Sequence, residues 1–419
     1  MRKQVQRVLK PICTLLALTC CLLFSTFGYV KTQIPDSVLY TEKADMLING
    51  IFPVKAVYSD TIGRVQGSEI NTETEYEANM KLFGIFPISR VTVKKVPTRV
   101  VSVLGTPFGI KMYADGVMVV GMSEVDAESG DLSPAKNAGI EIGDIIISVA
   151  GMSVSTNEEL AAAVESSGGN KIALVIKRNG ERKTLFLTPA FSKSEKCYRI
   201  GLWVRDSSAG IGTLTFYDPT TNVVAGLGHG IADRTTGDII PLLSGEMVGA
   251  EILGLEKSQN GSPGELQGRF TGQKVGSLFV NSSVGVYGTA QSVYATDRLY
   301  PIALRQQVKN GEAKILTTIE GKTPEFYDCR IDKIYLSDDG DSKSMTVTIT
   351  DSRLIDKTGG IVQGMSGSPI IQDGKLIGAV THVFINDCCR GYAVFAETML
   401  KTAESAEQLA DEKALKDAS

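Results

Sequence analysis

The feature that most constrains this chain is a glycine-rich loop that runs into β-forming residues at 358–371. Its sequence is TGGIVQGMSGSPII, in which Ser366 lies close to Gly364 and Gly367. Glycines let a backbone approach a substrate closely and adopt conformations that other residues avoid. A serine in such a loop can attack a carbonyl while nearby N–H groups face the developing oxyanion. The pattern favours a serine nucleophile over the plainer alternative, a glycine-rich hairpin turn.

Composition excludes several other classes of protein. The chain has 419 residues, enough for two or three domains, and its 43 basic and 47 acidic residues give no footprint for nucleic acid. A hydrophobic fraction of 43% with 43 glycines is typical of an ordered, turn-rich, mainly β protein. Only two histidines occur, so a mechanism that needs a histidine base has two candidates.

The seven cysteines show no metal-binding pattern. No Cys-x-x-Cys spacing is present, and two histidines could contribute little to a zinc site. The adjacent pair Cys388 and Cys389 leaves no clear disulfide framework, so we expect free or opportunistically paired thiols. We expect neither a metal nor a cofactor.

The N-terminal residues 1–30 are predicted to anchor the chain in a membrane. Residues 12–30 carry no charge, and a helix of this length spans about 28 Å, close to one bilayer core. The basic flank before it should stay in the cytoplasm, which places the rest of the chain outside. A cleaved signal peptide is the alternative, although no clear Ala-x-Ala site follows the apolar run.

Residues 31–100 carry weaker signals and are interpreted as a juxtamembrane β region. The hexapeptide GIFPVK at 50–55 is echoed by GIFPIS at 84–89, and alternating β-type residues follow the second copy. This predicts a small β unit with two similar halves, without a function.

Residues 101–190 resemble a PDZ domain. The specific part is the run AGIEIGDIII at 138–147, followed by a predicted helix over 157–166 and a strand pair that turns at Asn179-Gly180. In such domains a peptide adds as an extra strand, and the amides of a loop bind its carboxylate. The resemblance implies that Phe108, Gly109 and Ile110 form this loop. A PDZ-like fold that serves only as a spacer is the alternative.

Residues 191–419 are predicted to form the peptidase domain. Short β-type runs separated by turns suggest a barrel or sandwich, and the length suits a chymotrypsin-like double β-barrel. The fold class is therefore mainly β, with a transmembrane helix, a PDZ domain and then this double barrel. The segment 396–418 is predicted to be a surface helix.

A serine nucleophile needs a base and a group that orients the base. His229 lies in the tight glycine setting AGLGHGI, whereas His382 lies on an apparent strand sixteen residues after Ser366. We therefore interpret His229 as the base, and His382 with Phe384 as part of the wall of the substrate pocket. The N–H groups of Gly364 and Ser366 would form the oxyanion hole.

The third member is harder to assign from the residues. The chain order His229, Asp351, Ser366 is that of chymotrypsin, but a plain strand-end aspartate is equally compatible with the spacing. An α/β-hydrolase elbow is disfavoured, because Ser368 stands where Gly-x-Ser-x-Gly needs its second glycine. Five aspartates near β-type runs are candidates: Asp233, Asp238, Asp328, Asp332 and Asp351.

Together these features resemble the stage IV sporulation protein B peptidases of endospore-forming bacteria. Four segments carry the resemblance: KLFGIFPI at 81–88, VVAGLGHG at 223–230, GMSGSP at 364–369 and THVFIND at 381–387. The resemblance implies a triad of His229, Asp351 and Ser366. Cys388-Cys389 departs from the family pattern and puts the shape of that pocket-side loop in doubt.

The resemblance also implies a role for the protein. It would be made in the forespore and act between the two spore membranes, where it cleaves itself near its N-terminus. It would then cut the extracytoplasmic part of a membrane complex that inhibits an intramembrane protease, which permits activation of the late mother-cell sigma factor. The alternatives are a quality-control protease of the HtrA type, whose PDZ domain follows the protease domain, and a non-catalytic PDZ scaffold.

Overall fold

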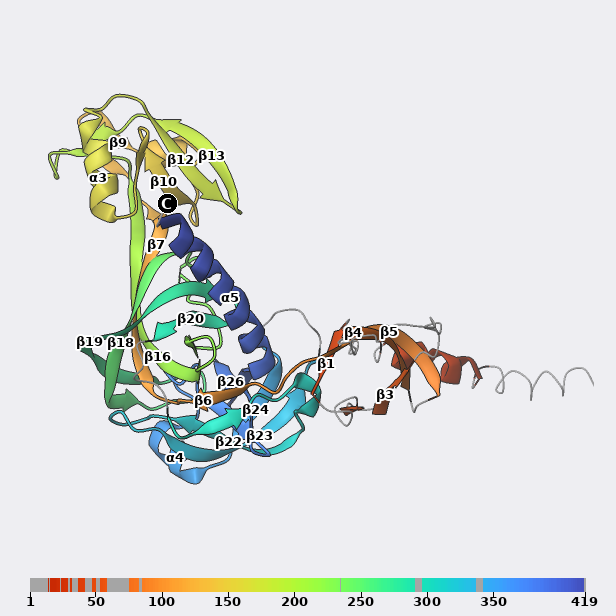
Figure 1. Ribbon diagram of the computed structural model, residues 1–419. Helices are drawn as coiled ribbons and strands as arrows, with labels where there is room; N and C mark the ends of the chain where they lie inside the picture. The colour runs from red at the N-terminus through yellow and green to blue at the C-terminus, as the bar shows by residue number, and fades with distance from the viewer. Residues whose placement is uncertain are drawn as a thin grey trace, which may run out of the picture.

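The computed structural model describes most of the chain after residue 84, and part of the segment before it. The described residues are 14, 16–22, 24–28, 31, 37–41, 47–49, 53–58, 75–82, 85–233, 235–290, 296–336 and 342–417. Figure 1 shows two barrels at the base, a smaller unit on a long two-stranded arm, and a β-sheet to one side. The fold is mainly β, as predicted.

The first barrel is a closed ring of six strands. The ring runs β7–β18–β19–β20–β17–β16, and pairing between β16 and β7 closes it. Buried apolar side chains fill it, among them Phe108, Ile110, Leu214, Val224 and Val286. The strands are β7 (Pro107–Met122), β16 (Leu202–Asp218), β17 (Val223–Gly226), β18 (Leu242–Glu256), β19 (Glu265–Ser282) and β20 (Gly285–Ala290). Two short strands, β6 (Val100–Val103) and β21 (Leu299–Pro301), extend the sheet beside β16.

The second barrel follows in the sequence and is also closed. Its strands are ordered β22-β23-β24-β27-β26-β25. Alternating burial along β23 shows one face turned to the barrel core, as period-two side chains require. The strands are β22 (Gly311–Thr317), β23 (Glu325–Ile334), β24 (Met345–Ile349), β25 (Pro369–Gln372), β26 (Lys375–Phe384) and β27 (Asp387–Phe395). The 3₁₀ helix η2 (Arg305–Gln307) precedes this barrel, and α4 (Ser352–Thr358) lies between β24 and β25.

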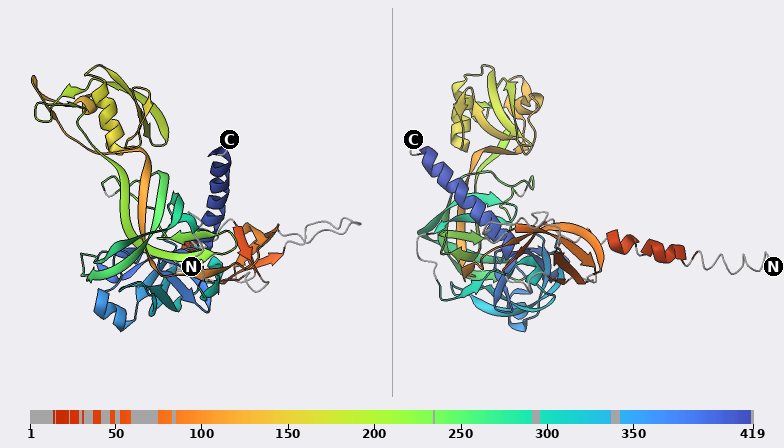
Figure 2. Two further views of the ribbon diagram at one scale, coloured as in Figure 1. Left: turned by 60° about the vertical axis from the view of Figure 1, so that its left-hand side comes forward. Right: turned by 45° about the vertical axis from the view of Figure 1, so that its right-hand side comes forward.

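The PDZ unit is inserted between two strands of the first barrel. β7 and β16 continue out of the barrel as a paired arm, and the unit sits at its end (Figure 2). Its own buried core includes Ile146, Leu160, Leu174 and Ile176. Its elements are β8 (Val125–Ala127), β9 (Gly130–Leu132), α2 (Pro134–Asn137), β10 (Ile145–Val149), β11 (Met152–Ser153), α3 (Asn157–Ser166), β12 (Ile172–Arg178), β13 (Glu181–Leu187), β14 (Ala190–Phe191) and β15 (Tyr198–Arg199).

This insertion departs from the predicted order of separate domains. The predicted PDZ domain 101–190 includes most of β6 and the first half of β7, which belong to the sheet of the first peptidase barrel. The boundary placed at 190/191 therefore divides that barrel between two domains. Local pattern could not show this, since a strand that serves two units has the same period-two signature throughout.

The C-terminal helix α5 (Ala396–Asp417) lies along the barrels, as the blue helix in Figure 1 shows. Met399, Ala403 and Ala406 are buried against the core that contains Tyr287 and Val394. The first turn is tied down by Glu397, which accepts hydrogen bonds from the backbone and guanidinium of Arg305. The predicted helix over 396–418 is thus present, with one face buried.

The N-terminal sheet lies beside the second barrel. Its strand order is β1-β5-β4-β3-β2, and Tyr40, Met80 and Val93 join the buried cluster of that barrel. Its strands are β1 (Ser37–Tyr40), β2 (Leu47–Asn49), β3 (Pro53–Tyr58), β4 (Glu75–Leu82) and β5 (Phe86–Lys95). The predicted repeat at 50–55 and 84–89 lies partly outside the described residues.

The predicted membrane anchor also lies partly outside them, since the structure describes only some of the residues in 1–30. Within the described part of the chain, no helix is both long enough and apolar enough to cross a membrane. The predicted transmembrane helix is not supported.

Candidate active site

The loop of Ser366 and the loop of His229 are in direct contact. Ser366 precedes β25 of the second barrel, and His229 follows β17 of the first. A Cβ on Gly367 would lie 2.5 Å from the backbone nitrogen of Leu227, and one on Gly228 would lie 3.0 Å from Cγ2 of Thr381. The two loops approach each other so closely, where the barrels join, that neither glycine position has room for a side chain.

Both histidines of the chain lie at this junction. The imidazole rings of His229 and His382 are 4.8 Å apart between centroids and tilted by 35°. Ser366 is half-buried beside them, and its hydroxyl donates to the carbonyl of Thr381 at 2.8 Å. His382 is exposed on β26, so it lies at the nucleophile but on the solvent side. Phe384, predicted with it as pocket wall, stacks edge-on against Tyr392 with centroids 4.7 Å apart.

The environment of His229 suits a general base. Its Nδ1 lies 2.9 Å from the carbonyl oxygen of Gly230. Since a carbonyl only accepts, Nδ1 must carry the proton, and the neutral ring then presents the lone pair of Nε2. Burial lowers the pKa of His229, and the Gly230 hydrogen bond opposes this more weakly. The ring is therefore neutral near pH 7.

The N–H groups of Gly364 and Ser366 are free and have fixed directions. Neither donates a hydrogen bond to another described residue. The carbonyl of Gln363 accepts from the N–H of Leu266 at 2.9 Å, and that of Met365 accepts from the N–H of Ser368 at 2.9 Å. In a trans peptide the C=O and the next N–H point in opposite directions. These two bonds therefore fix the directions of the free N–H groups, opposite to Leu266 and to Ser368, as a preorganised oxyanion hole requires.

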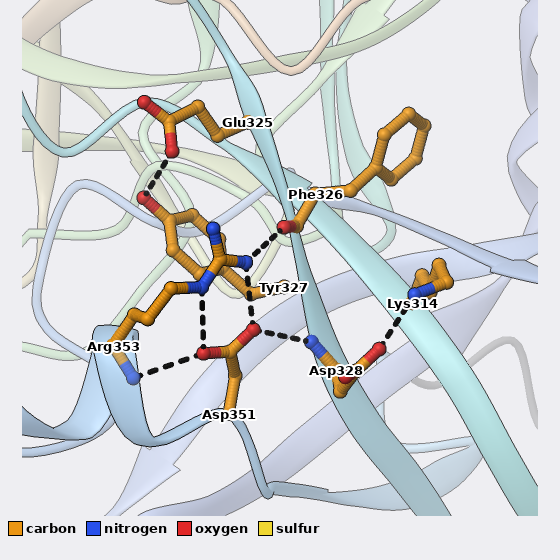
Figure 3. A network of polar contacts seen from close by, with 7 residues as sticks. All are labelled: Lys314, Glu325, Phe326, Tyr327, Asp328, Asp351 and Arg353. Carbon is orange, nitrogen blue, oxygen red and sulfur yellow. Dashed lines mark hydrogen bonds and ion pairs between the residues drawn. The ribbon is translucent and has the colours of Figure 1, made fainter.

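Among the described residues, Asp351 forms no hydrogen bond with His229, and its carboxylate lies in the network that Figure 3 shows. Its place in the triad implied by the resemblance stays a prediction. Its Oδ1 accepts from the backbone N–H and Nε of Arg353 at 2.9 and 3.1 Å. Its Oδ2 accepts from the backbone N–H of Asp328 at 3.2 Å and from Arg353 at 2.8 Å. The carboxylate caps α4 and pairs with Arg353. Every hydrogen bond it makes within the described chain goes to β23 or α4, so its observed role is structural.

The other candidate aspartates do not reach the imidazole either. Asp233 is fully buried and forms an ion pair with Arg205, while its Oδ1 accepts from the N–H groups of Thr235 and Thr236. Asp332 accepts from Arg330 and Thr348 in the second barrel. Within the described chain, no carboxylate forms a hydrogen bond with His229.

Asn281 is a residue of this region that sequence reasoning missed. Its Oδ1 accepts from the N–H of Ile231 at 2.8 Å, and its Nδ2 donates to the carbonyls of Ile231 and Ile240, both at 2.9 Å. One amide thus closes the loop that begins at His229. An asparagine near a strand end carries no signal in the sequence that would distinguish this role from an ordinary turn.

The predicted peptide-binding loop of the PDZ unit is corrected by the structure. Phe108, Gly109 and Ile110 lie in β7, where β16 pairs with one edge and β18 with the other. Phe108 and Ile110 are buried in the first barrel. With both edges paired and the side chains in a core, these residues cannot receive a peptide strand.

The groove of the PDZ unit lies instead between α3 and the start of β16. It has a volume of about 280 Å³, and Leu160, Val164 and Ile200 form its apolar floor. Among the described strands, only β7 pairs with β16 over 202–205, which leaves the other edge open for an added strand. Gly201 takes a φ of +75° at the head of this strand, where a Cβ would lie 2.3 Å from the carbonyl of Ser123.

The described residues contain no group of three or more His, Cys, Asp or Glu side chains that could hold a metal ion. Cys388 is buried and donates to the carbonyl of Gln259 at 3.3 Å, while Cys389 is half-buried; both are free thiols.

Comparison with known proteins agrees with this geometry. Residues 196–400 match the family model described as SpoIVB peptidase S55, and residues 128–178 match the model of a PDZ domain. These matches confirm the resemblance inferred from the sequence.

Similar individual proteins cover smaller parts of the chain. A putative zinc metalloprotease of Clostridium acetobutylicum is 34% identical over 95 residues, which is 23% of this chain and 27% of the relative. The zinc metalloprotease RasP of Oceanobacillus iheyensis is 26% identical over 143 residues, 30% of this chain and 33% of the relative. The chain thus spans about a third or less of the curated relatives it matches. The active form of the Rv3671c protease from M. tuberculosis is 15% identical, with a TM-score of 0.29, over 46% of this chain and 72% of that one.

Proposed function

We propose that this protein, a serine peptidase whose residues 196–400 belong to the SpoIVB peptidase S55 family, uses Ser366 as its nucleophile and His229 as its general base. The observation that carries the assignment is the junction of the two barrels. There the loops of Ser366 and His229 touch, and two aimed N–H groups stay free beside the serine.

Each group has a definite task in peptide hydrolysis. Ser366 attacks the scissile carbonyl while Nε2 of His229 takes the hydroxyl proton, and His229 then returns the proton to the leaving amine. The N–H groups of Gly364 and Ser366 stabilise the negative oxygen of each tetrahedral intermediate. Water then attacks the acyl-enzyme with His229 as base again. Before the first step, the Ser366 hydroxyl must turn from the Thr381 carbonyl, where it rests in this structure, towards His229.

Labelling with a fluorophosphonate probe tests these roles directly. The wild-type protein should be labelled, and Ser366→Ala should not be. His229→Ala should be labelled about 10³-fold more slowly, because the nucleophile and its base act as a unit. Ser368→Ala is the matched control, since this serine lies in the same loop but is fully buried against Thr317. Equal labelling of wild type and Ser366→Ala would overturn the assignment.

For the substrate, we propose that the protein cleaves itself and the extracytoplasmic part of a membrane regulatory complex during sporulation. This cleavage would signal activation of the late mother-cell sigma factor, and the site of action would be the space between the spore membranes. Support comes from the family match and from the PDZ unit, whose open strand edge suits a protein partner.

The test is to place Ser366→Ala at the native locus of the host and to follow a reporter of the late sigma factor. We expect the reporter to stay silent and self-cleavage to stop. Normal reporter activity in cells whose Ser366→Ala protein cannot be labelled would favour the non-catalytic scaffold instead.

A further inference from the structure

Every backbone carbonyl of the nucleophile loop, residues 363–367, accepts a hydrogen bond. Three of the five donors belong to β16, and two of these three are threonine hydroxyls. The other two donors are backbone N–H groups from β19 and from the residue that follows the loop. In chain order from residue 363 to 367 they are the Leu266 N–H at 2.9 Å, the Thr213 hydroxyl at 2.8 Å, the Ser368 N–H at 2.9 Å, the Thr213 N–H at 3.0 Å and the Thr215 hydroxyl at 2.7 Å.

The two threonines are buried at the contact between the barrels. Thr213 is 1% exposed and Thr215 is 0% exposed, so water cannot replace their hydroxyls. Both belong to the first barrel, which also carries His229, whereas the nucleophile loop belongs to the second barrel. The hydroxyls therefore tie the serine to the half of the molecule that holds the base.

The loop needs such ties because its glycines permit other arrangements. Gly364 has a φ of +96° and Gly367 a φ of +95°, in a region that glycine enters at little cost and leaves as easily. The Gly364–Met365 peptide lies between the two peptides that carry the oxyanion N–H groups, and its carbonyl accepts from Thr213. The carbonyl of the Gly367–Ser368 peptide accepts from Thr215, and the N–H of the same peptide donates to the Met365 carbonyl, in the peptide that carries the Ser366 N–H. A carbonyl held by a buried hydroxyl resists rotation of its peptide, because turning it away leaves a buried polar group without a partner.

We infer that Thr213 and Thr215 are positioning residues that hold the oxyanion hole of Ser366 in its active geometry. The inference rests on the proposed function of Ser366. The threonines touch no reacting atom, and they act through the carbonyls of Gly364 and Gly367.

The test compares the rate of fluorophosphonate labelling in wild type, Thr213→Val, Thr215→Val and Thr213→Ser. Valine keeps the shape of threonine and removes the hydroxyl. We expect each valine variant to be labelled at least about tenfold more slowly, with the pH midpoint of labelling unchanged, since His229 is untouched. Thr213→Ser keeps the hydroxyl and should label within about threefold of wild type.

Thr318→Val is the matched control. Its hydroxyl is equally buried and donates to a glycine carbonyl, that of Gly105, outside the nucleophile loop. Labelling of the folded Thr213→Val and Thr215→Val proteins at the rate of Thr318→Val would overturn the inference, as would a slow Thr213→Ser. If Thr213→Val does not fold, Thr215→Val and Thr213→Ser decide. A wild type that is not labelled would instead reject the proposed function.

Discussion

At the residue scale, the lowered pKa of His229 predicts how the rate of labelling depends on pH. Burial lowers its pKa below the ordinary 6.5. Labelling of Ser366 requires the neutral imidazole, so the rate should rise with pH and reach half its plateau below pH 6.5. The measurement is the labelling rate across pH 4 to 9, corrected for hydrolysis of the probe alone. A midpoint at or above 6.5 would contradict the burial of the base.

The contacts of Asp351 predict that its replacement lowers the stability of the fold and leaves the labelling of Ser366 unchanged. The hydrogen bond with Arg353 is the main cause that lowers its pKa from 3.8 to about 2. A carboxyl whose pKa is lower in the folded state stabilises the fold above its unfolded pKa, and this stability is lost as the pH falls towards the folded pKa. Asp351→Asn should therefore lower the free energy of unfolding at pH 7 by about 1–2 kcal/mol, because an exposed arginine partner limits the effect.

Denaturant unfolding at several pH values measures this effect. The difference between wild type and Asp351→Asn should shrink between pH 4 and pH 2, and the labelling rate of the folded variant should equal that of wild type. Asp356→Asn on the exposed face of α4 is the control. A folded Asp351→Asn protein that labels about 10³-fold more slowly would instead support the triad implied by the resemblance.

These residues show where sequence reasoning works and where it stops. The contact between the loops of Ser366 and His229 could be anticipated, because each residue sits among glycines whose local pattern favours a catalytic side chain. The partner of a carboxylate depends on what lies around it in space. Arg353, only two residues after Asp351, captures that carboxylate, and spacing from Ser366 could not reveal this.

At the element scale, short units were predictable and long strands were not. The helix over 157–166 is confirmed as α3, whose capping box at Thr156 and Glu159 fixes its start. The turn at Asn179-Gly180 is confirmed with a positive φ at both residues. By contrast, the sixteen-residue β7 pairs with β16 along one edge throughout, while its other edge changes partner from β18 in the barrel to β10 in the PDZ unit. Partner choice is a tertiary property, so Phe108–Ile110 were assigned to the wrong unit.

At the scale of the whole molecule, the inserted PDZ unit raises the question of whether the active site depends on it. The unit has its own buried core, and the residues around Ser366 and His229 come from the barrels. Val119 and Val204 are directly paired across the arm. Replacing 120–203 by Asn-Gly would therefore join them through a two-residue hairpin turn.

We expect this shortened protein to fold and to be labelled within about threefold of wild type, while cleavage of its protein substrate falls because the groove is gone. The PDZ core buries Val117 and Val119 in the full chain, so its removal would expose them. The shortened protein therefore also carries Val117→Thr and Val119→Thr. The design keeps Arg205, so buried Asp233 retains its partner. Labelling rate and self-cleavage, measured on the same preparations, separate the two roles. A shortened protein that folds but is not labelled would show that the PDZ unit maintains the active site through the β7–β16 arm.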